Sequence, residues 1–424
     1  MTSELLQQVR AIDPASGADR TADVWIENGT VRAIEPTFAT ADGELPAGTI
    51  IRDVRGCVLA PGLTDLYSHS GEPGDDSVET LASLQAAAAA GGFTRVAILP
   101  DTDPCLDRPE VIATVRDRAE GGATRLLIWG ALTSSRGGDR LSEMTELAAA
   151  GVVGLSDGAP IEDLLLLRRQ LEYAQPLGLP LAIWPYSTRL TGGGTAREGV
   201  DSLRFGLVGD PAMSETALLA AAIECVAELG VPVHFMRVST ARGVELIDRA
   251  KQQGLDITAS TAWTHLLLST RGLRRYDPNF RLAPPLGTPR DRDALIDAVQ
   301  SGTIDAIAID HRPIAYEDKT VAFAEAPPGT IGLELALPLL WQEFVEPGRW
   351  SPLELWRALS LSPARCLGHE PPRLQAEAPA ELVLFEPNRT WTVSPETLKS
   401  RSCNTPWLGR QIAGRVVQTY RHGL

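Results

Sequence analysis

The feature that most constrains the fold is a regular alternation of short apolar, β-rich runs with longer helix-like segments. The segments between the runs, such as residues 214–230 and 240–254, end in glycine, the residue that usually follows the last turn of a helix. Strands that alternate with helices form a parallel sheet, because parallel strands need a crossover connection. Eight such units are the number found in a TIM barrel; a doubly wound sheet of this length would be unusual. The eight runs are residues 57–66, 93–100, 124–132, 152–157, 179–186, 231–238, 255–261 and 303–310.

The two ends of the chain have a different pattern. Residues 21–36 read as a strand, an Asn-Gly turn and a second strand, which is a strong hairpin signal. Residues 380–393 and 409–423 again read as short strands. We therefore predict two domains: a composite β-sandwich domain formed by residues 1–55 and 375–424, and a (β/α)8 barrel formed by residues 56–374.

Composition narrows the possible partners and the compartment. The net charge is -15, with 54 acidic and 39 basic residues, and an acidic chain without a basic run is a poor ligand for nucleic acid or anionic membrane. There is no apolar stretch long enough to span a bilayer and no signal-peptide pattern at the N-terminus. The five cysteines are odd in number and widely spaced, which argues against a disulfide framework and favours a cytoplasmic protein.

Candidate functional residues come from the geometry of the barrel, whose reactive groups project from the C-terminal ends of the strands. A catalytic metal needs three or more ligands that converge on one point. His69, Asp157 and Asp310 could hold a divalent ion weakly, or could pair with an arginine, and the residue types alone leave both possibilities open. The other strand-end residues are Tyr67, Asp101, Trp184, Tyr186, Arg237, Thr264, His265 and His311.

Several other residues are expected to be structural. His234 lies three positions before Arg237 on one strand, so strand alternation predicts that it faces the helices. The glycine run at 192–194 lacks the strand–turn–helix context and the following Lys-Ser/Thr of a phosphate loop. Trp184 and Trp263 are predicted to pack rather than to stack on a ligand.

Ordered motifs along the chain carry a family resemblance. They are PGLTDLYSHSGEPG (61–74), LPDTDPCLD (99–107), GLSDGAP (154–160), VHFMRVSTARGVELI (233–247), YDPNFRLAPPLGT (276–288), AIDHRPI (308–314), APPGTIGLE (326–334) and NTPWLGRQIAGRVVQT (404–419). Together they resemble the motifs of dihydroorotase, of the amidohydrolase superfamily, over nearly the whole chain. The resemblance implies a TIM barrel with a small composite β-domain and a role in pyrimidine biosynthesis.

The metal site of the family is altered at three of its four histidines. Those histidines fall at Tyr67, Trp184 and Arg237, whereas His69 and the aspartates at Asp157 and Asp310 are kept. Tyrosine is a rare zinc ligand, tryptophan has no lone pair to offer, and arginine is a cation. None of the three lysines (Lys251, Lys319 and Lys399) follows a strand, where a bridging carboxylated lysine would have to lie. No metal is therefore expected, and Asp310, the family's general acid/base position, is predicted to be vestigial.

The substrate side is altered as well. The family's carboxylate-clamping arginine falls at Gly71, and its asparagine in the second motif falls at Asp101. Its asparagine before the double proline falls at Ala283, and its histidine in the DHAPH motif falls at Ile314. Loss of both the metal ligands and the substrate contacts predicts that the chain neither binds nor hydrolyses dihydroorotate.

Without a metal, the buried carboxylates of Asp157 and Asp310 would lie close together with no compensating charge and would destabilise the fold. Arg237 comes from an adjacent strand and carries a fixed charge on a fork of donors. We predict that its guanidinium occupies the place of the metal and pairs with Asp157, Asp310 or both.

Three functions remain open at this stage. The resemblance implies a non-catalytic partner of aspartate carbamoyltransferase, because inactive homologues assemble with that enzyme. The chain is expected to be cytoplasmic and homo-oligomeric, and a homodimer with an unrelated scaffold role is also possible. The second possibility is an active zinc-dependent dihydroorotase or cyclic amidohydrolase with a rearranged site at His69, Asp157 and Asp310, with His311 as an optional ligand. The third is a ligand sensor whose barrel mouth is lined by Trp184, Tyr186 and Trp263.

Overall fold

The eight apolar runs form the parallel strands of a TIM barrel in the computed structural model, which describes residues 3–38, 45–46 and 48–421. One four-stranded sheet has the order β6-β7-β8-β9 and a second the order β10-β13-β14-β15. A bridge between Leu155 and Leu181 joins the two sheets, and the Asp310 N–H closes the ring by donating to the Tyr67 carbonyl at 3.1 Å. The strands are β6 (Leu63–Ser68), β7 (Phe93–Ile98), β8 (Arg125–Gly130), β9 (Gly154–Leu155), β10 (Ala182–Ile183), β13 (Val233–Phe235), β14 (Ile257–Ala262) and β15 (Ala306–Ala308).

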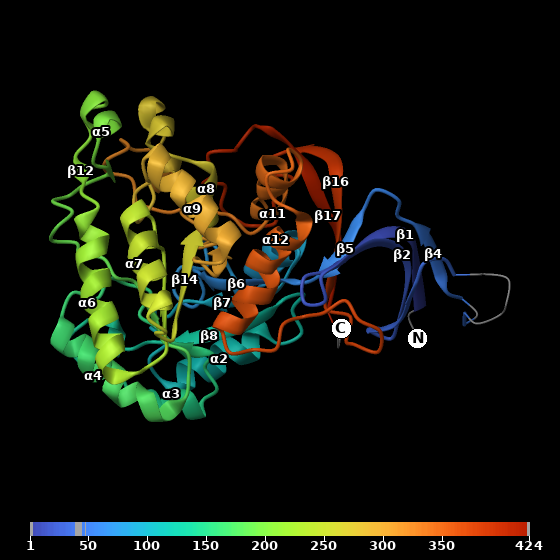
Figure 1. Cartoon of the computed structure of the whole chain (residues 1–424), viewed down its shortest axis with the longest axis horizontal. Coiled ribbons are helices and arrows are strands. Elements are labelled where there is room, and N and C mark those ends of the chain that lie inside the picture. Colours follow the sequence, from blue (N-terminus) through green and yellow to red (C-terminus); the bar gives the residue numbers. More distant parts are fainter. Residues whose placement is uncertain (1–2, 39–44, 47, 422–424) are drawn as a thin grey trace.

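Helices follow the strands and cover the outside of the barrel (Figure 1). Local sequence sets their ends: α9 begins with a capping box between Thr288 and Asp291 and stops at Gly302, whose φ is 85°, a left-handed conformation that favours glycine. The helices between the strands are α1 (Leu81–Ala90), α2 (Pro109–Ala119), α3 (Met144–Ala149), α4 (Leu164–Ala174), α6 (Met213–Leu229), α7 (Ala241–Gln252), α8 (Trp263–Leu267) and α9 (Pro289–Ser301).

Two further groups of elements extend the barrel. Between β10 and α6 the chain makes an excursion through β11 (Ala196–Arg197), α5 (Val200–Arg204) and β12 (Gly209–Asp210), and a 3-10 helix, η3 (Thr270–Arg275), follows α8. After β15 come α10 (Tyr316–Lys319), α11 (Ala336–Leu340), α12 (Pro352–Trp356) and α13 (Ser362–Cys366), with π-helical turns at Trp341–Val345 and Arg357–Leu361. Shorter 3-10 turns lie at Ser134–Arg136, Gln175–Leu177 and Pro278–Phe280.

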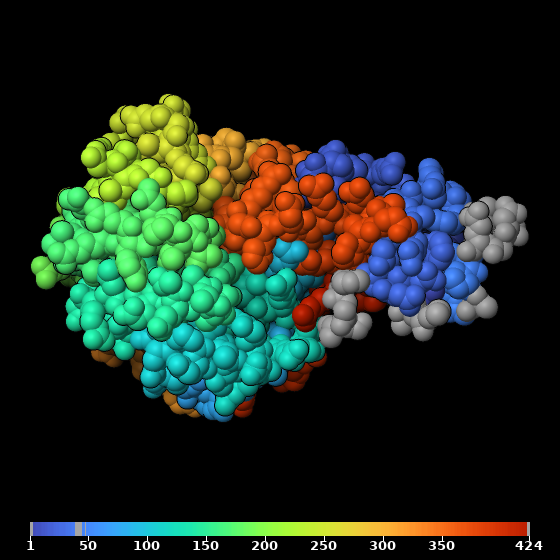
Figure 2. All heavy atoms as spheres, turned by 90° about the horizontal axis from the view of Figure 1, so that it is seen from below, coloured from blue at the N-terminus to red at the C-terminus, as the bar shows by residue number. Residues whose placement is uncertain are grey.

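Strands from both ends of the chain share one seven-stranded sheet beside the barrel. They are β1 (Ser3–Asp13), β2 (Ala18–Glu27), β3 (Thr30–Glu35), β4 (Ile50–Asp53), β5 (Val58–Pro61), β16 (Leu382–Thr392) and β17 (Gln411–Tyr420). β5 lies in the stretch that the sequence assigned to the barrel, yet it pairs with β1 and β16. Seen from below, the N-terminal strands form a smaller lobe at one end of the molecule, and C-terminal segments lie between them and the barrel (Figure 2).

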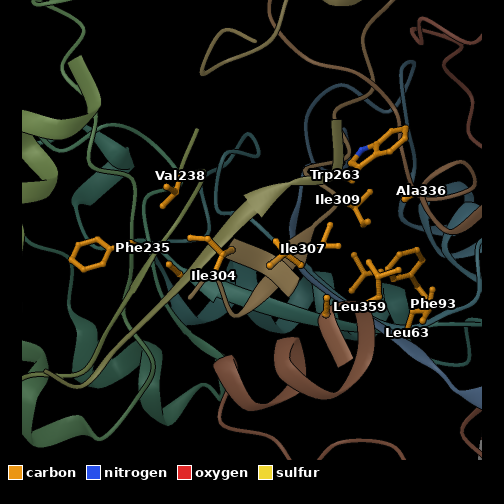
Figure 3. Close-up of a cluster of buried hydrophobic side chains, with 14 of the residues drawn as sticks. Leu63, Phe93, Phe235, Val238, Trp263, Ile304, Ile307, Ile309, Ala336 and Leu359 are labelled. Atoms are coloured by element: carbon orange, nitrogen blue, oxygen red, sulfur yellow. The ribbon is translucent and has the colours of Figure 1, made fainter. Parts of the chain in front are cut away.

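The main core lies between the barrel strands and their helices. Figure 3 shows part of it, where Ile307 of β15, Trp263 of α8 and Leu359 of the C-terminal π-turn contribute buried side chains. A second buried cluster, which includes Tyr67, Trp129 and Met236, fills the inside of the barrel, as inward-facing side chains do in this fold. In the described part of the chain, none of the helices combines the length and the apolar character needed to cross a bilayer.

Candidate functional site

Arg237 lies in the mouth of the barrel, on the segment directly after β13. Its φ is 57°, a left-handed conformation that is uncommon for a long side chain and clusters at functional sites. The side chain is only 3% exposed. Nε donates to Asp310 Oδ2 at 2.9 Å and an Nη atom donates to Asp310 Oδ1 at 2.6 Å, while the other Nη donates to the Gly158 carbonyl at 3.0 Å. The fork of the guanidinium is therefore bidentate on one carboxylate.

Two aromatic rings enclose this guanidinium. Its central carbon lies 4.6 Å from the ring centroid of Trp184 and 5.2 Å from that of Tyr67, within the range of cation–π attraction. The Tyr67 hydroxyl accepts from the Arg237 N–H at 3.1 Å and contacts Ser260 Oγ at 3.0 Å. Burial raises the pKa of Tyr67 above its ordinary value, so this phenol stays neutral and offers no anionic ligand.

Asp310, also left-handed with a φ of 49°, is held as a carboxylate. Burial opposes its ionisation, but the charge and hydrogen bonds of Arg237 outweigh burial and hold the pKa of Asp310 well below its usual range. Arg237 stays charged, because the attraction of Asp310 exceeds the cost of burial and raises the pKa of Arg237. The two groups form a buried, mutually neutralising ion pair.

His69 lies between two carboxylates. Its Nδ1 is 2.5 Å from Asp101 Oδ2, and its Nε2 is 3.3 Å from Asp310 Oδ1 and 3.4 Å from an Arg237 Nη. Burial opposes the ionisation of Asp101, but His69 overcomes it and the pKa of Asp101 lies far below its usual range. Both ring nitrogens of His69 thus face polar groups of the chain.

Asp157, the other retained ligand position, does not join this cluster. The Thr133 N–H donates to its Oδ1 at 3.0 Å and the Thr133 hydroxyl to its Oδ2 at 2.7 Å. Burial raises the pKa of Asp157, and the Thr133 bonds oppose the rise. The arginine that contacts Asp157 is Arg136, whose Nε donates to the Asp157 backbone carbonyl at 2.6 Å. Of the two carboxylates considered for Arg237, the structure pairs it with Asp310.

The four altered substrate positions have diverse surroundings. A Cβ atom at Gly71 would overlap the carbonyl oxygens of Asp75 and Glu79, so the backbone leaves no room there for an arginine. Asp101 is bound to His69, and Ala283 lines the barrel mouth. The Ile314 N–H donates to Asn404 Oδ1 at 3.2 Å, and its side chain lines a different cavity.

Two histidines differ from the sequence expectations. His311 turns away from the mouth: its Nδ1 accepts from the Gly332 N–H at 3.1 Å, and its Nε2 faces buried Glu79 at 3.3 Å. His234 was expected to face the helices, but its Nε2 contacts Ser260 Oγ at 2.8 Å inside the barrel. The left-handed Arg237 breaks the strand alternation on which that expectation depended. Burial lowers the pKa of His234 to about 3, which fits a neutral structural residue.

A cavity of about 320 Å³ opens above the Arg237–Asp310 pair. Arg136, Arg312 and His265 line it together with His69, Asp101 and Trp184. The two lining arginines were not foreseen: Arg136 is placed by a left-handed backbone (φ 53°), which the Arg-Gly-Gly sequence hints at but does not specify. His265 Nε2 is buried without a hydrogen-bond partner, and burial lowers the pKa of His265 to about 4.

The aromatic lining expected of a ligand sensor is only partly present. Trp184 lines the mouth cavity. The Tyr186 hydroxyl donates to Asp210 at 3.2 Å and its ring stacks on Trp184, whereas Trp263 is buried and stacks on Trp407 with centroids 5.0 Å apart.

The residues in the mouth do not fit a zinc ion. A guanidinium points at the carboxylate that would bind the ion, and the neighbouring positions carry a neutral phenol and an indole, which are poor or impossible zinc ligands. Across residues 3–38, 45–46 and 48–421, no group of three or more His, Cys, Asp or Glu side chains is arranged to hold a metal.

Comparison with known proteins gives the chain its family. A sequence model described as Dihydro-orotase-like matches residues 56–242. A "Probable dihydroorotase-like protein" of Synechocystis sp. is 43% identical over 98% of this chain and 99% of its own length. A protein named "Dihydroorotase" from Pelobacter propionicus is 37% identical over 98% of this chain and 97% of its own length. The chain belongs to the dihydroorotase family.

Solved structures agree with this assignment at the level of the fold. L-hydantoinase from Arthrobacter aurescens superposes with a TM-score of 0.86 at 20% identity, over 100% of this chain and 96% of its own. D-hydantoinase from Thermus sp. has a TM-score of 0.82 at 21% identity. Dihydroorotases and hydantoinases are cyclic amide hydrolases, so this dihydroorotase-family chain has the scaffold of such enzymes and an altered set of residues in its mouth.

Proposed function

We propose that this dihydroorotase-family chain is a non-catalytic protein of pyrimidine biosynthesis that assembles with aspartate carbamoyltransferase and supports its structure or activity. The observation that carries the proposal is the bidentate Arg237–Asp310 pair in the barrel mouth. A buried guanidinium bonded to the family's acid/base carboxylate removes that carboxylate from proton transfer, because its pKa is far below the working range of a general acid or base.

The substrate side supports the same proposal. Gly71, where the family has its carboxylate-clamping arginine, cannot accept a larger side chain without a backbone shift. Asp101 places a negative charge beside the mouth and is occupied by His69. Because Asp101 is bonded to His69, it is not free to contact a substrate, and this loss of substrate contacts comes in addition to the loss of the metal ligands.

The kept scaffold supports an assembly role. The chain matches its relatives over nearly its whole length, and its fold matches solved hydantoinases, which supports a retained scaffold around the altered mouth. Aspartate carbamoyltransferase is the proposed partner through the family resemblance, and a cytoplasmic homo-oligomer is the proposed state of the chain.

A co-purification experiment tests the proposal. The untagged chain is expressed with and without aspartate carbamoyltransferase of the same organism, and complex formation is followed by sedimentation velocity. Hydrolysis of dihydroorotate is measured in both preparations in the presence of zinc, with an active dihydroorotase as control. We expect a defined complex and no hydrolysis by the chain alone; absence of a complex, or turnover by the isolated chain, contradicts the proposal.

An active zinc-dependent cyclic amidohydrolase is the second candidate. The observation in its favour is that relatives 36–37% identical over 98% of the chain are named dihydroorotase. This alternative requires Arg237 to leave Asp310, and it predicts about one tightly held zinc per chain and hydrolysis of dihydroorotate without a partner.

A further inference from the structure

A protrusion on the mouth side of the barrel carries features that the fold does not explain. It is formed by α5 and η3, which project at the end of the molecule away from the N-terminal strands (Figure 1). The two parts are joined directly: the Thr270 hydroxyl donates to Asp201 at 2.6 Å, and the Tyr276 hydroxyl donates to the Phe205 carbonyl at 2.7 Å. We call residues 196–213 and 270–276 the α5–η3 surface.

The inner side of the α5–η3 surface has a small core of its own. Ala196 and Leu273 are buried in a cluster with Leu282, and Phe205 packs against that cluster. A fully buried ion pair between Arg197 and Asp210, 2.8 Å long, fixes the base of the excursion. These contacts hold the protrusion in a defined conformation, and a surface that is already ordered loses little conformational entropy on binding.

The outer side carries large apolar residues that this core does not use. Val200, Leu203, Val208 and Met213 are 72%, 82%, 55% and 56% exposed. Val200 and Leu203 lie one turn apart on α5, and large apolar side chains left exposed on one short excursion are typical of interaction sites on soluble proteins.

The same surface is basic, although the chain as a whole carries a net charge of -15. Arg204, Arg271, Arg274 and Arg275 are all exposed, whereas Glu198 is the single exposed carboxylate among residues 196–213 and 270–276. None of these four forms an ion pair with another residue in the described part of the chain. Arginine beside apolar residues is the composition that protein interfaces favour.

We propose that the α5–η3 surface docks a partner protein that presents an apolar centre surrounded by Asp and Glu. The inference rests on the proposed function, in which that partner is aspartate carbamoyltransferase. Charge decides the choice of occupant: two copies of this chain that met through this surface would bring their arginines together, and like charges across an interface are costly. An acidic partner instead gains both burial of the apolar side chains and neutralisation of the arginines.

The test is the affinity of the full chain for aspartate carbamoyltransferase. The first variant is Leu203→Ser/Arg274→Glu on the α5–η3 surface. The matched control is Leu165→Ser/Arg169→Glu on α4, where Leu165 is 57% exposed and Arg169 is also exposed. We expect the first variant to raise the Kd about tenfold or more and the control to leave it unchanged. Both should keep the wild-type thermal midpoint, and the wild-type Kd should rise with ionic strength.

Each outcome has one meaning. If the wild type binds and the two variants bind equally well, the docking surface is wrong and the proposed function stands. If the wild type does not bind aspartate carbamoyltransferase, the proposed function fails and this inference fails with it. If the wild type self-associates and only the Leu203→Ser/Arg274→Glu variant prevents it, the occupant is a second copy and the acidic partner is refuted.

Discussion

Arg237→Met is the perturbation that most sharply probes the role of the arginine in the mouth. Methionine keeps much of the side-chain volume but removes both bonds to Asp310, the bond to the Gly158 carbonyl and the cation–π contact with Trp184. Asp310, whose side chain is 16% exposed, would keep only His69 at 3.3 Å. Removal of one partner from a buried ion pair costs about 3–5 kcal/mol, and we expect a loss of that size in the free energy of unfolding.

Urea unfolding at pH 7, followed by tryptophan fluorescence, measures this loss. Arg168→Met is the matched control, because Arg168 is 63% exposed and pairs with Glu172 on the surface of α4; it should cost less than about 0.5 kcal/mol. A double variant, Arg237→Met/Asp310→Leu, should recover most of the lost stability, since it leaves no unpaired buried charge.

The pH dependence gives a second check. The pKa of Asp310 is depressed in the folded chain, so its pairing stabilises the wild type above the ordinary carboxyl pKa of about 4 and is lost as the pH falls through the depressed value. In Arg237→Met, burial without the arginine favours protonated Asp310, so the deficit relative to wild type should shrink as the pH falls. An Arg237→Met or Arg237→His variant as stable as wild type would refute the pairing argument.

Three further outcomes follow from the structure, two from the mouth and one from the buried carboxyl of Glu334, which accepts from the Lys399 and Ser400 N–H groups. Arg237→His alone should give no dihydroorotate hydrolysis, because Tyr67 and Trp184 still lack suitable donors; turnover in a zinc-supplemented assay would contradict this. Gly71→Arg should lower the thermal midpoint without restoring substrate binding, since its Cβ would overlap backbone oxygens; an unchanged midpoint would show that the loop yields easily. Burial raises the pKa of Glu334 from 4.5 to about 7, so the contribution of Glu334 to stability should decline as the pH rises through this range. Glu334→Gln should remove that decline from the thermal midpoints; parallel pH profiles of the variant and the wild type would show that Glu334 does not cause it.

Much of the fold is encoded in local patterns. The eight apolar runs became the eight barrel strands because buried parallel strands read as continuous apolar segments. The α5 excursion was not predicted, since β11 and β12 are two residues each and no periodicity exists at that length. The sequence assigned β5 to the barrel because β5 continues almost directly into β6. Only the pairing of β5 with β1 and β16 shows that it belongs to the seven-stranded sheet and that β6 begins the barrel.

The mouth was harder to predict than the barrel. Arg237 and Asp310 follow β13 and β15, which are not neighbours as expected but are separated by β14; the long arginine side chain spans that distance across the mouth to reach the carboxylate. Asp157 stays apart because the Thr133 hydroxyl and N–H satisfy it first, and that depends on a loop conformation. The His69–Asp101 pair was missed because Asp101 was treated as a strand-end residue and a substituted substrate contact but not as a partner of His69; the signal available was that the two residues follow the adjacent strands β6 and β7.

We infer that the Arg237 guanidinium takes the place of the metal in this dihydroorotase-family barrel. The most direct measurement is the zinc content per chain of untagged protein that has been incubated with zinc and then desalted. We expect a value near zero. About one tightly held zinc per chain would contradict this inference, and would make the zinc-dependent cyclic amidohydrolase the leading assignment.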